Sequence, residues 1–338
     1  MSTRITIKNS FFINVTQDYT MLLNKTLFFI HLPKTAGTSF RFAAINYFGK
    51  DACHFDYGSA SPDTSDSVKQ YAYERRDFFQ LQQQLHQNDA KFLAGHVGFR
   101  RYNAFVPASN VVSFIRDPLK QFISHYEHKM RHHDYKETLE TMLHSHAGPE
   151  LQARNLQGIP IEAYGFIGIT ERYEESLMLF NHFYQTNLEY STLNTNPNKK
   201  PETYRLPEHL VNAFKQSAAL SYYLYNKANK TLDKRLIALR NNYEYAHATV
   251  TAHTATHVEG FAFYARNNNA VQVQLLINGK VIRTSFATDE RPNLRSANVS
   301  RNGYVGFKFA LPPNLGAGDD VYVRIPATNQ EVYRSQDN

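Results

Sequence analysis

The sequence of 338 residues contains no tryptophan and a single cysteine, Cys53. One cysteine cannot form a disulfide bond within the chain. No apolar run approaches the roughly 18 residues that a membrane-spanning helix needs, so the sequence predicts no membrane span. Large apolar side chains come instead from 24 Phe and 22 Tyr, and the apolar content of 42% supports well-formed cores in two domains.

Positive charge exceeds negative charge, with 37 Lys and Arg against 30 Asp and Glu, which gives a net charge of +7. Such a surface suits a polyanionic cosubstrate and an acidic acceptor. Nucleic acid would also be attracted. However, the sequence has no zinc-finger spacing, no aromatic RNA-binding signature and no dense stripe of Lys and Arg, so we predict no nucleic-acid partner.

Residues 27–41 form the most informative segment of the chain. Leu27–Ile30 is a short apolar run typical of a buried parallel strand, and residues 40–47 have the apolar spacing of a helix. Pro33 and several small residues separate the two and predict a tight turn, which directs backbone N–H groups and the positive end of the helix dipole towards an anion. One cation and three hydroxyls add to this predicted phosphate or sulfate site: Lys34, Thr35, Thr38 and Ser39.

This turn differs from the common nucleotide-binding loop. The Walker pattern places Lys and Ser or Thr directly after the second of two glycines, whereas Lys34 here precedes the only glycine, Gly37. A kinase is further disfavoured because no acidic strand end suits magnesium. The plain alternative is an ordinary strand-to-helix turn with an exposed lysine.

A second segment predicts another anion site. Val111–Ile115 is a further β-rich run, and Arg116 follows it, so that Arg116 is expected at the carboxyl end of a strand. Asp117 can cap the helix that Pro118 opens. Ser124 lies further along that helix. A guanidinium fork with a serine hydroxyl suits a terminal phosphate, in the crevice where open α/β sheets bind ligands.

The two segments together resemble sulfotransferases that use 3′-phosphoadenosine 5′-phosphosulfate (PAPS). Residues 33–39 are similar to their 5′-phosphosulfate loop, and Arg116-Asp-Pro with Ser124 is similar to their 3′-phosphate motif. Residues 92–99 resemble the segment that carries the catalytic base in heparan sulfate and uronyl 2-O-sulfotransferases. Residues 165–180 and 220–239 resemble segments that close the nucleotide pocket in that group. On these motifs the chain is identified as a member of the PAPS-dependent carbohydrate sulfotransferases.

The resemblance implies an α/β fold, a P-loop-like three-layer domain with a central parallel sheet. It implies PAPS as cosubstrate and no metal. Arg116 and Ser124 would hold the 3′-phosphate. The residues implied at the 5′-phosphosulfate are Lys34, Thr35, Ala36, Gly37, Thr38 and Ser39.

Charge considerations assign two catalytic roles. Sulfuryl transfer leaves negative charge on a phosphate oxygen, which Lys34 is placed to stabilise, and the acceptor hydroxyl must lose a proton to a base, for which we choose His96. The alternative for His96 is a structural histidine. Two departures from the resembling group stand out: Ala94 where a second histidine is usual, and Gln121 where the 3′-phosphate helix usually has arginine.

Four further histidines crowd the helix after Pro118: His125, His128, His132 and His133. The pair His128 and His132 has a spacing that can chelate a metal, but no glutamate stands in the His-Glu-x-x-His arrangement. We therefore predict a solvated basic face, which could meet an acidic substrate.

The change in composition and apolar pattern along the chain predicts two domains. Residues 1–244 form the catalytic domain, residues 245–257 a linker, and residues 258–338 a β-sandwich accessory domain. Within the last, Asn278-Gly279 between alternating segments is a strong hairpin signal, and Asn302-Gly303 a weaker one. This domain resembles β-rich modules of bacterial glycan-modifying enzymes. Carbohydrate recognition, packing and oligomerisation all remain open as its role.

The acceptor is expected to carry a hydroxyl, most plausibly on an anionic glycan. The start of the chain has no apolar segment of signal-peptide length, which leads us to expect a bacterial cytoplasmic enzyme. A non-catalytic protein that keeps the nucleotide site is the alternative from a different functional class. Oligomeric state stays open.

Overall fold

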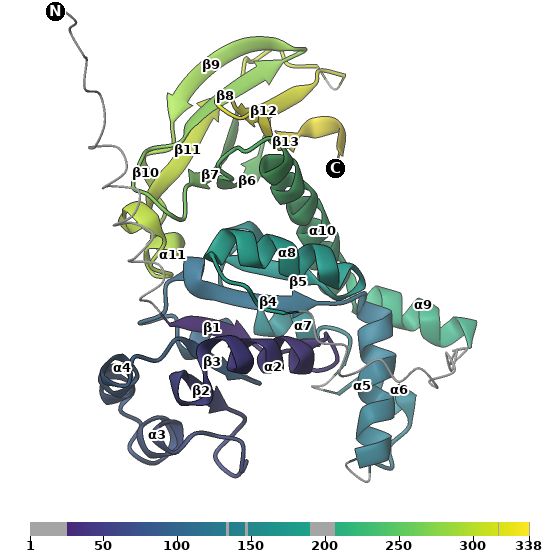
Figure 1. Ribbon diagram of the computed structural model, residues 1–338. Coiled ribbons are helices and arrows are strands. Elements are labelled where there is room, and N and C mark those ends of the chain that lie inside the picture. The colour runs from purple at the N-terminus through teal and green to yellow at the C-terminus, as the bar shows by residue number, and fades with distance from the viewer. Residues whose placement is uncertain (1–25, 133–134, 146–147, 190–206, 317, 338) are drawn as a thin grey trace, which may run out of the picture.

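A parallel sheet of five strands forms the centre of the N-terminal part (Figure 1). The computed structural model describes residues 26–132, 135–145, 148–189, 207–316 and 318–337. The strands lie in the order β2-β3-β1-β4-β5, and all neighbours run parallel. Their bounds are β1 (Leu27–Ile30), β2 (Cys53–Asp56), β3 (Phe92–Gly95), β4 (Val111–Ile115) and β5 (Phe166–Ile169). The predicted α/β class is confirmed.

Helices cover this sheet. The α-helices are α2 (Gly37–Phe48), α3 (Asp66–Val68), α4 (Phe78–Gln87), α5 (Pro118–His132), α6 (Leu139–Leu143), α7 (Leu151–Asn155), α8 (Tyr173–Tyr184), α9 (Glu208–Ser217) and α10 (Ala219–Arg240). Short helices fill the connections: the π-helix η2 (Lys69–Glu74) and the 3-10 helices η1 (Lys50–Ala52), η3 (Phe99–Arg101), η4 (Ala108–Asn110), η5 (Ile161–Ala163) and η6 (Thr170–Arg172).

Phenylalanine rings fill the space between the sheet and its helices. Strands β1, β3, β4 and β5 are buried along their whole length, which explains their uninterrupted apolar sequences. Phe40 of α2 lies 4.8 Å from Phe29 of β1 and 5.0 Å from Phe180 of α8, measured between ring centroids. The rings therefore fix α2, and with it the turn that precedes it, against the sheet.

The carboxyl ends of the five strands lie at one edge of the sheet because all strands are parallel. His31 follows β1, His96 follows β3 and Arg116 follows β4. Strand β1 lies between β3 and β4, so the chain reverses its direction across the sheet at this point. Such a switch point is where open α/β sheets bind ligands.

Two antiparallel sheets of four strands follow the parallel sheet. One has the order β10-β11-β7-β6 and the other β13-β12-β8-β9. Apolar residues from both sheets share one core, so the predicted β-sandwich is confirmed. The bounds are β6 (His247–His253), β7 (His257–Phe263), β8 (Gln272–Ile277), β9 (Lys280–Phe286), β10 (Asp289–Glu290), β11 (Tyr304–Ala310), β12 (Val321–Ile325) and β13 (Gln330–Arg334), with helices α11 (Pro292–Arg295), η7 (Ser300–Gly303) and η8 (Ser335–Asp337).

Three segments of the β-rich part have a local structure that can be compared with the sequence prediction. Asn278-Gly279 forms the predicted hairpin between β8 and β9, with both residues at positive φ. Asn302-Gly303 is no hairpin turn, because both residues belong to η7, and α11 lies between η7 and the preceding strand β10. The linker expected at residues 245–257 instead contains β6, whose alternation of apolar and polar residues is hidden by its many Ala, Thr and His.

Residues 71–87, whose many Gln, Leu and Phe favour a helix, are divided between two helices. The π-helix η2 ends before Arg76, which has a φ of 54°, and Asp77 then caps α4 by accepting a hydrogen bond from the backbone N–H of Gln80 at 3.0 Å. The sequence signal for this break is Asp77, a residue type that caps helices, directly after Arg75 and Arg76.

The β-sandwich is joined firmly to the parallel domain. Phe261, Leu294 and Val305 belong to the same buried cluster as the strands of the parallel sheet. Thr249 donates a hydrogen bond to Glu162 at 3.0 Å across the junction. Helix α10 runs from the parallel sheet to β13, and contacts elements of both parts (Figure 1).

Two short β-rich runs in residues 1–24 favour an edge strand or hairpin, and the Asn, Pro and Lys of residues 192–201 favour a loop. Both segments lie outside the described residues. Within the described part of the chain, no helix is both long enough and apolar enough to cross a membrane.

Candidate active site

The loop between β1 and α2 has the backbone shape of an anion site. Lys34 and Ala36 both lie in the left-handed region, with φ of 66° and 64°. Such residues cost of order 1–3 kcal/mol each and gather at ligand sites, where successive N–H groups form a concave nest for anions. The N-cap of α2 is Ala36, whose methyl side chain cannot accept hydrogen bonds from the first turn of the helix. The loop therefore presents N–H groups to an anion.

Side chains bind three successive carbonyl groups of this loop. Thr35, which is fully buried, donates its hydroxyl to the carbonyl of Leu32 at 3.0 Å. The amide of Gln121 donates to the carbonyl of Pro33 at 2.9 Å. The guanidinium of Arg116 donates to the carbonyl of Lys34 at 3.3 Å. We call these three contacts the carbonyl clamp. It fixes the peptide orientation on which the anion nest depends.

The clamp gives two of these residues a structural role. The hydroxyl of Thr35, a predicted cosubstrate ligand, donates within the loop. Gln121, which stands where the resembling group usually has arginine, is buried at 2% exposure and holds the loop in place.

Arg116 is fixed by two other segments. The side-chain amide of Gln152, on α7, accepts from the Arg116 N–H and donates to its carbonyl, both at 2.9 Å. Glu171 lies 3.8 Å from the Arg116 guanidinium and accepts a hydrogen bond from the N–H of Asp117 at 3.1 Å. Asp117 caps α5 as predicted, since it accepts from Lys120 N–H at 2.9 Å. No sequence pattern had pointed to Gln152 or Glu171.

The remaining predicted ligands follow the loop and Arg116. Gly37, Thr38 and Ser39 form the first turn of α2, where Thr38 is exposed and Ser39 is buried. Ser124 is half-buried on α5.

His96 is placed directly after β3, at the same edge of the sheet. Its N–H donates to the carbonyl of Asp56 at 3.1 Å. Gly95 allows this approach, because a Cβ there would lie 2.1 Å from the same oxygen. Although His96 is exposed at the surface, packed protein atoms around its ring, and then the charges of Arg41 and His128, lower its pKa to about 4. The imidazole is therefore neutral near pH 7 and able to accept a proton.

Comparison with known proteins decides the family. Residues 17–267 match the profile described as the sulfotransferase family. The chain belongs to this family. It is also similar to the crystal structure of a sulfotransferase from Alicyclobacillus acidocaldarius, with 13% identity over 61% of this chain and 96% of that chain, and a TM-score of 0.36. None of the curated proteins matches the sequence.

His31 of this sulfotransferase was missed by sequence reasoning. Its ring lies 4.8 Å from the ring of His96, and its Nδ1 lies 2.8 Å from the Tyr57 hydroxyl. A Cβ on Gly37 would come within 2.1 Å of the His31 ring, so Gly37 is needed for the ring to fit beside the loop. Burial, and then the charges of His96 and Arg41, lower the pKa of His31 to about 3. A polar residue directly after a buried strand was the available signal.

Among the described histidines of α5, those expected on a solvated face are partly covered. His125 and His128 are half-buried. Burial, followed by the charges of Lys129, His128, His96 and Lys34, lowers the pKa of His125 to about 4. The side chain of His132 and all of His133 lie outside the described residues. Among the described side chains, no group of three His, Cys, Asp or Glu could hold a metal ion.

A pocket of about 390 Å³ begins at Val97, the residue that follows His96 in this sulfotransferase. Three arginines line it: Arg100, Arg101 and Arg154. Arg154 lies on α7, two residues after the Gln152 that fixes Arg116. Arg101 is held by Asp56, with 3.2 Å between Nε and Oδ2. The pocket is therefore basic. The segment after β3, which carries His96, and helix α7, which carries Gln152, both contribute to its walls.

We expect both His96 and His31 to stay neutral well below pH 6. Below about pH 6.5 the unfolded chain binds protons at His96 and His31 that the folded protein does not bind. The two residues therefore make the free energy of unfolding fall as the pH drops below about 6.5, and they leave it unchanged above that pH. Imidazole NMR should show titration midpoints of about 4 for His96 and about 3 for His31. Midpoints near 6.5 would contradict the lowering of both pKa values by the protein atoms packed around the two rings.

Proposed function

We propose that this protein transfers a sulfuryl group from PAPS to a hydroxyl of a carbohydrate. The observation that carries the proposal is the carbonyl clamp, in a chain of the sulfotransferase family. The clamp uses residues of both anion motifs, so the loop and Arg116 form one site. A loop held with its N–H groups outward, beside an arginine, fits a donor with two separated phosphate groups.

The donor would lie along the edge of the parallel sheet. Its 5′-phosphosulfate would bind the loop residues 34–39, through backbone N–H groups, the Lys34 ammonium and the Thr38 hydroxyl. Its 3′-phosphate would bind Arg116 and Ser124. Glu171 now lies 3.8 Å from the Arg116 guanidinium, so an incoming phosphate would compete with a carboxylate for it.

The reaction needs one proton acceptor and one cation. The bond between sulfur and the phosphate oxygen breaks while sulfur bonds to the acceptor oxygen. His96 would take the proton of the acceptor hydroxyl, and Lys34 would stabilise charge on the departing phosphate. The lowered pKa of His96 keeps it in the unprotonated form that this role requires.

The basic pocket beside His96 supports an anionic acceptor. Arg100 and Arg154 line a space of about 390 Å³ that starts one residue after the base. Guanidinium groups bind carboxylate or sulfate with paired hydrogen bonds. We place an acidic group of the acceptor glycan there, next to the sugar that carries the reacting hydroxyl.

Similarity to heparan sulfate and uronyl 2-O-sulfotransferases is part of the proposal. The second histidine usual in that group would fall at Ala94, which is fully buried within β3. His31 supplies a ring next to His96 instead. For the β-sandwich we favour a packing role, because its residues share the buried cluster of the parallel domain.

Binding of the donor is tested with 3′,5′-adenosine bisphosphate and no metal. At 100 times its dissociation constant, a ligand adds ~2.7 kcal/mol to the free energy of unfolding, so the melting temperature of the wild type should rise. Arg116→Ala should lose this shift, whereas Arg131→Ala, a change at an exposed position of α5, should retain it. No shift at millimolar ligand in folded wild type would contradict the proposal, and a shift only with ATP and Mg²⁺ would favour a kinase.

His96→Ala should lower kcat by ~10²–10⁴. Its melting shift with 3′,5′-adenosine bisphosphate should be unchanged, because donor binding does not involve the base. Transfer of radiolabelled sulfate from PAPS to an oligosaccharide measures the rate, with His86→Ala, an exposed position on α4, as the control. A full rate in His96→Ala would show that another group is the base. Donor binding by the wild type without any transfer would favour a non-catalytic protein.

Arg100→Ala combined with Arg154→Ala should raise KM for a hexuronic acid oligosaccharide. A hydrogen bond to a charged group contributes ~1.5–3 kcal/mol, so we expect roughly ten- to hundredfold. The methyl ester of the same oligosaccharide, which is uncharged, should show little change. Arg283→Ala on the exposed strand β9 is the control. Equal effects on both oligosaccharides would rule out recognition of acidic groups by this pocket.

A further inference from the structure

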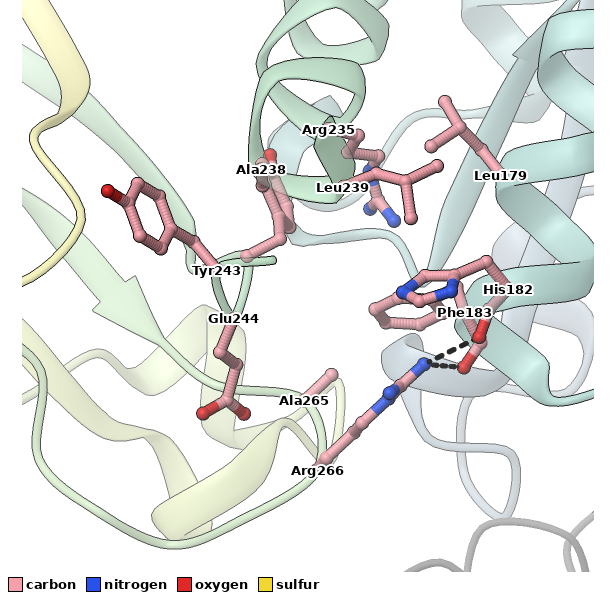
Figure 2. Close-up of a pocket in the computed structure, with 11 residues that line it drawn as sticks. Leu179, His182, Phe183, Arg235, Ala238, Leu239, Tyr243, Glu244, Ala265 and Arg266 are labelled. Atoms are coloured by element: carbon pink, nitrogen blue, oxygen red, sulfur yellow. Dashed lines mark hydrogen bonds between the residues drawn. The ribbon is translucent and has the colours of Figure 1, made fainter. Parts of the chain in front are cut away.

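A second basic cavity lies between the two parts of the protein, away from the phosphate loop. Its walls come from α8, from α10 and from the chain that leads into and out of the first β-sandwich strands (Figure 2). A volume of about 60 Å³ is open to water-sized spheres, which exceeds the ~10–15 Å³ that one water needs. The cavity can therefore hold a small ion or several waters.

Arg235 of α10 carries an uncompensated charge at this cavity. Its side chain is buried at 5% exposure, and one nitrogen, Nη2, donates to the carbonyl of Gly165 at 2.8 Å. Its Nε and Nη1 are buried and have no hydrogen-bond partner among the described residues. Burial lowers the pKa of Arg235, while Tyr245, whose hydroxyl also hydrogen-bonds the guanidinium, and Tyr184 favour the charged form. An arginine nevertheless remains protonated in proteins.

Aromatic rings surround this guanidinium and compensate part of its charge. The Arg235 Cζ lies 4.5 Å from the ring centre of Tyr245 and 5.0 Å from that of Phe183. Contacts of this kind stabilise a guanidinium by less than the burial of an unpaired ion costs, so the rings alone do not offset the burial of this charge. Water could satisfy the N–H groups but would not neutralise the charge.

A second guanidinium approaches the same ring. Arg266 lies 4.6 Å from the centre of Phe183 and donates hydrogen bonds to the carbonyl groups of His182 and Phe183. Figure 2 shows Arg235 and Arg266 reaching Phe183 from different sides of the junction. One carboxyl group also lines the cavity, that of Glu244, which accepts from Asn267 at 2.9 Å. Burial raises the pKa of Glu244, so its negative charge is disfavoured there.

From this arrangement we propose that the cavity binds a small oxyanion of the sulfate or phosphate type between the two parts of the protein. The anion would accept hydrogen bonds from Nε and Nη1 of Arg235 and neutralise its charge. Since Arg235 belongs to α10 and Arg266 to the β-sandwich side, a bound anion would strengthen the junction. This site is separate from the proposed donor site and does not depend on sulfuryl transfer.

Selenate is the probe for the first test, because it is tetrahedral and scatters anomalously. Crystals grown without sulfate or phosphate are soaked in selenate, and anomalous density is expected beside Arg235. The phosphate loop acts as an internal control, since it should also bind an oxyanion. Density at the loop with only water beside Arg235 would overturn the proposal.

Two variants with opposite expected effects test the site in solution. The rise in melting temperature with selenate, at constant ionic strength, is compared with that of wild type. Arg235→Met should reduce the rise and Glu244→Gln should increase it, because the first removes the charged donor and the second removes a carboxyl group whose ionised form competes with the anion. The phosphate loop is unchanged in all three proteins, so its contribution cancels. If Arg235→Met does not fold, Glu244→Gln still decides, and an unchanged rise there would overturn the proposal.

Discussion

A backbone loop can offer its N–H groups to an anion only while its carbonyl groups are bound elsewhere. Here Thr35, Gln121 and Arg116 bind the carbonyls of three successive residues. Lys34 and Ala36 adopt left-handed conformations that are unfavourable for residues with a side chain. The clamp contributes to holding these conformations, so the anion site depends on contacts with a helix far along the chain.

The clamp also joins the site to the rest of the domain. Gln152 fixes the backbone of Arg116, and Glu171 pairs with its side chain. On the other side of the loop, Gly37 leaves space for His31, whose ring contacts His96. The donor loop, the 3′-phosphate arginine and the candidate base are thus positioned by a connected set of contacts. A change in any of these supporting residues would move a group that the proposed reaction uses.

Basic side chains gather at several places in this molecule. His96, His125 and His31 all have lowered pKa values, because the packed protein around their rings and neighbouring cations disfavour their protonated forms. Three arginines line the pocket that begins at Val97, and Arg101 among them pairs with Asp56. At the junction with the β-sandwich, Arg235 is buried without an acidic hydrogen-bond partner among the described residues. Anions are the ligands that such surroundings favour.

The sequence by itself determined the elements that depend on local order. Short apolar runs specified buried strands, the Asp117-Pro118 pair specified the start of a helix, and Asn278-Gly279 specified a hairpin. These signals are readable because the neighbouring residues alone set the backbone conformation. Residues 245–257 were predicted to be a linker because they are rich in small polar residues. They contain a strand that becomes apparent only from its pairing with β7.

Tertiary structure decided which side chains meet. Gln121 lies 88 positions from Pro33, and Gln152 lies 36 positions from Arg116, yet each pair is joined by a hydrogen bond. No local pattern encodes such contacts, since they arise from the parallel order β3-β1-β4, which brings distant strand ends to one edge. The same order placed His31 next to His96, and the charge of Lys34 contributes to the lowered pKa of His125. The residue types of the site were therefore present in the sequence, whereas their partners and protonation states were set by the fold.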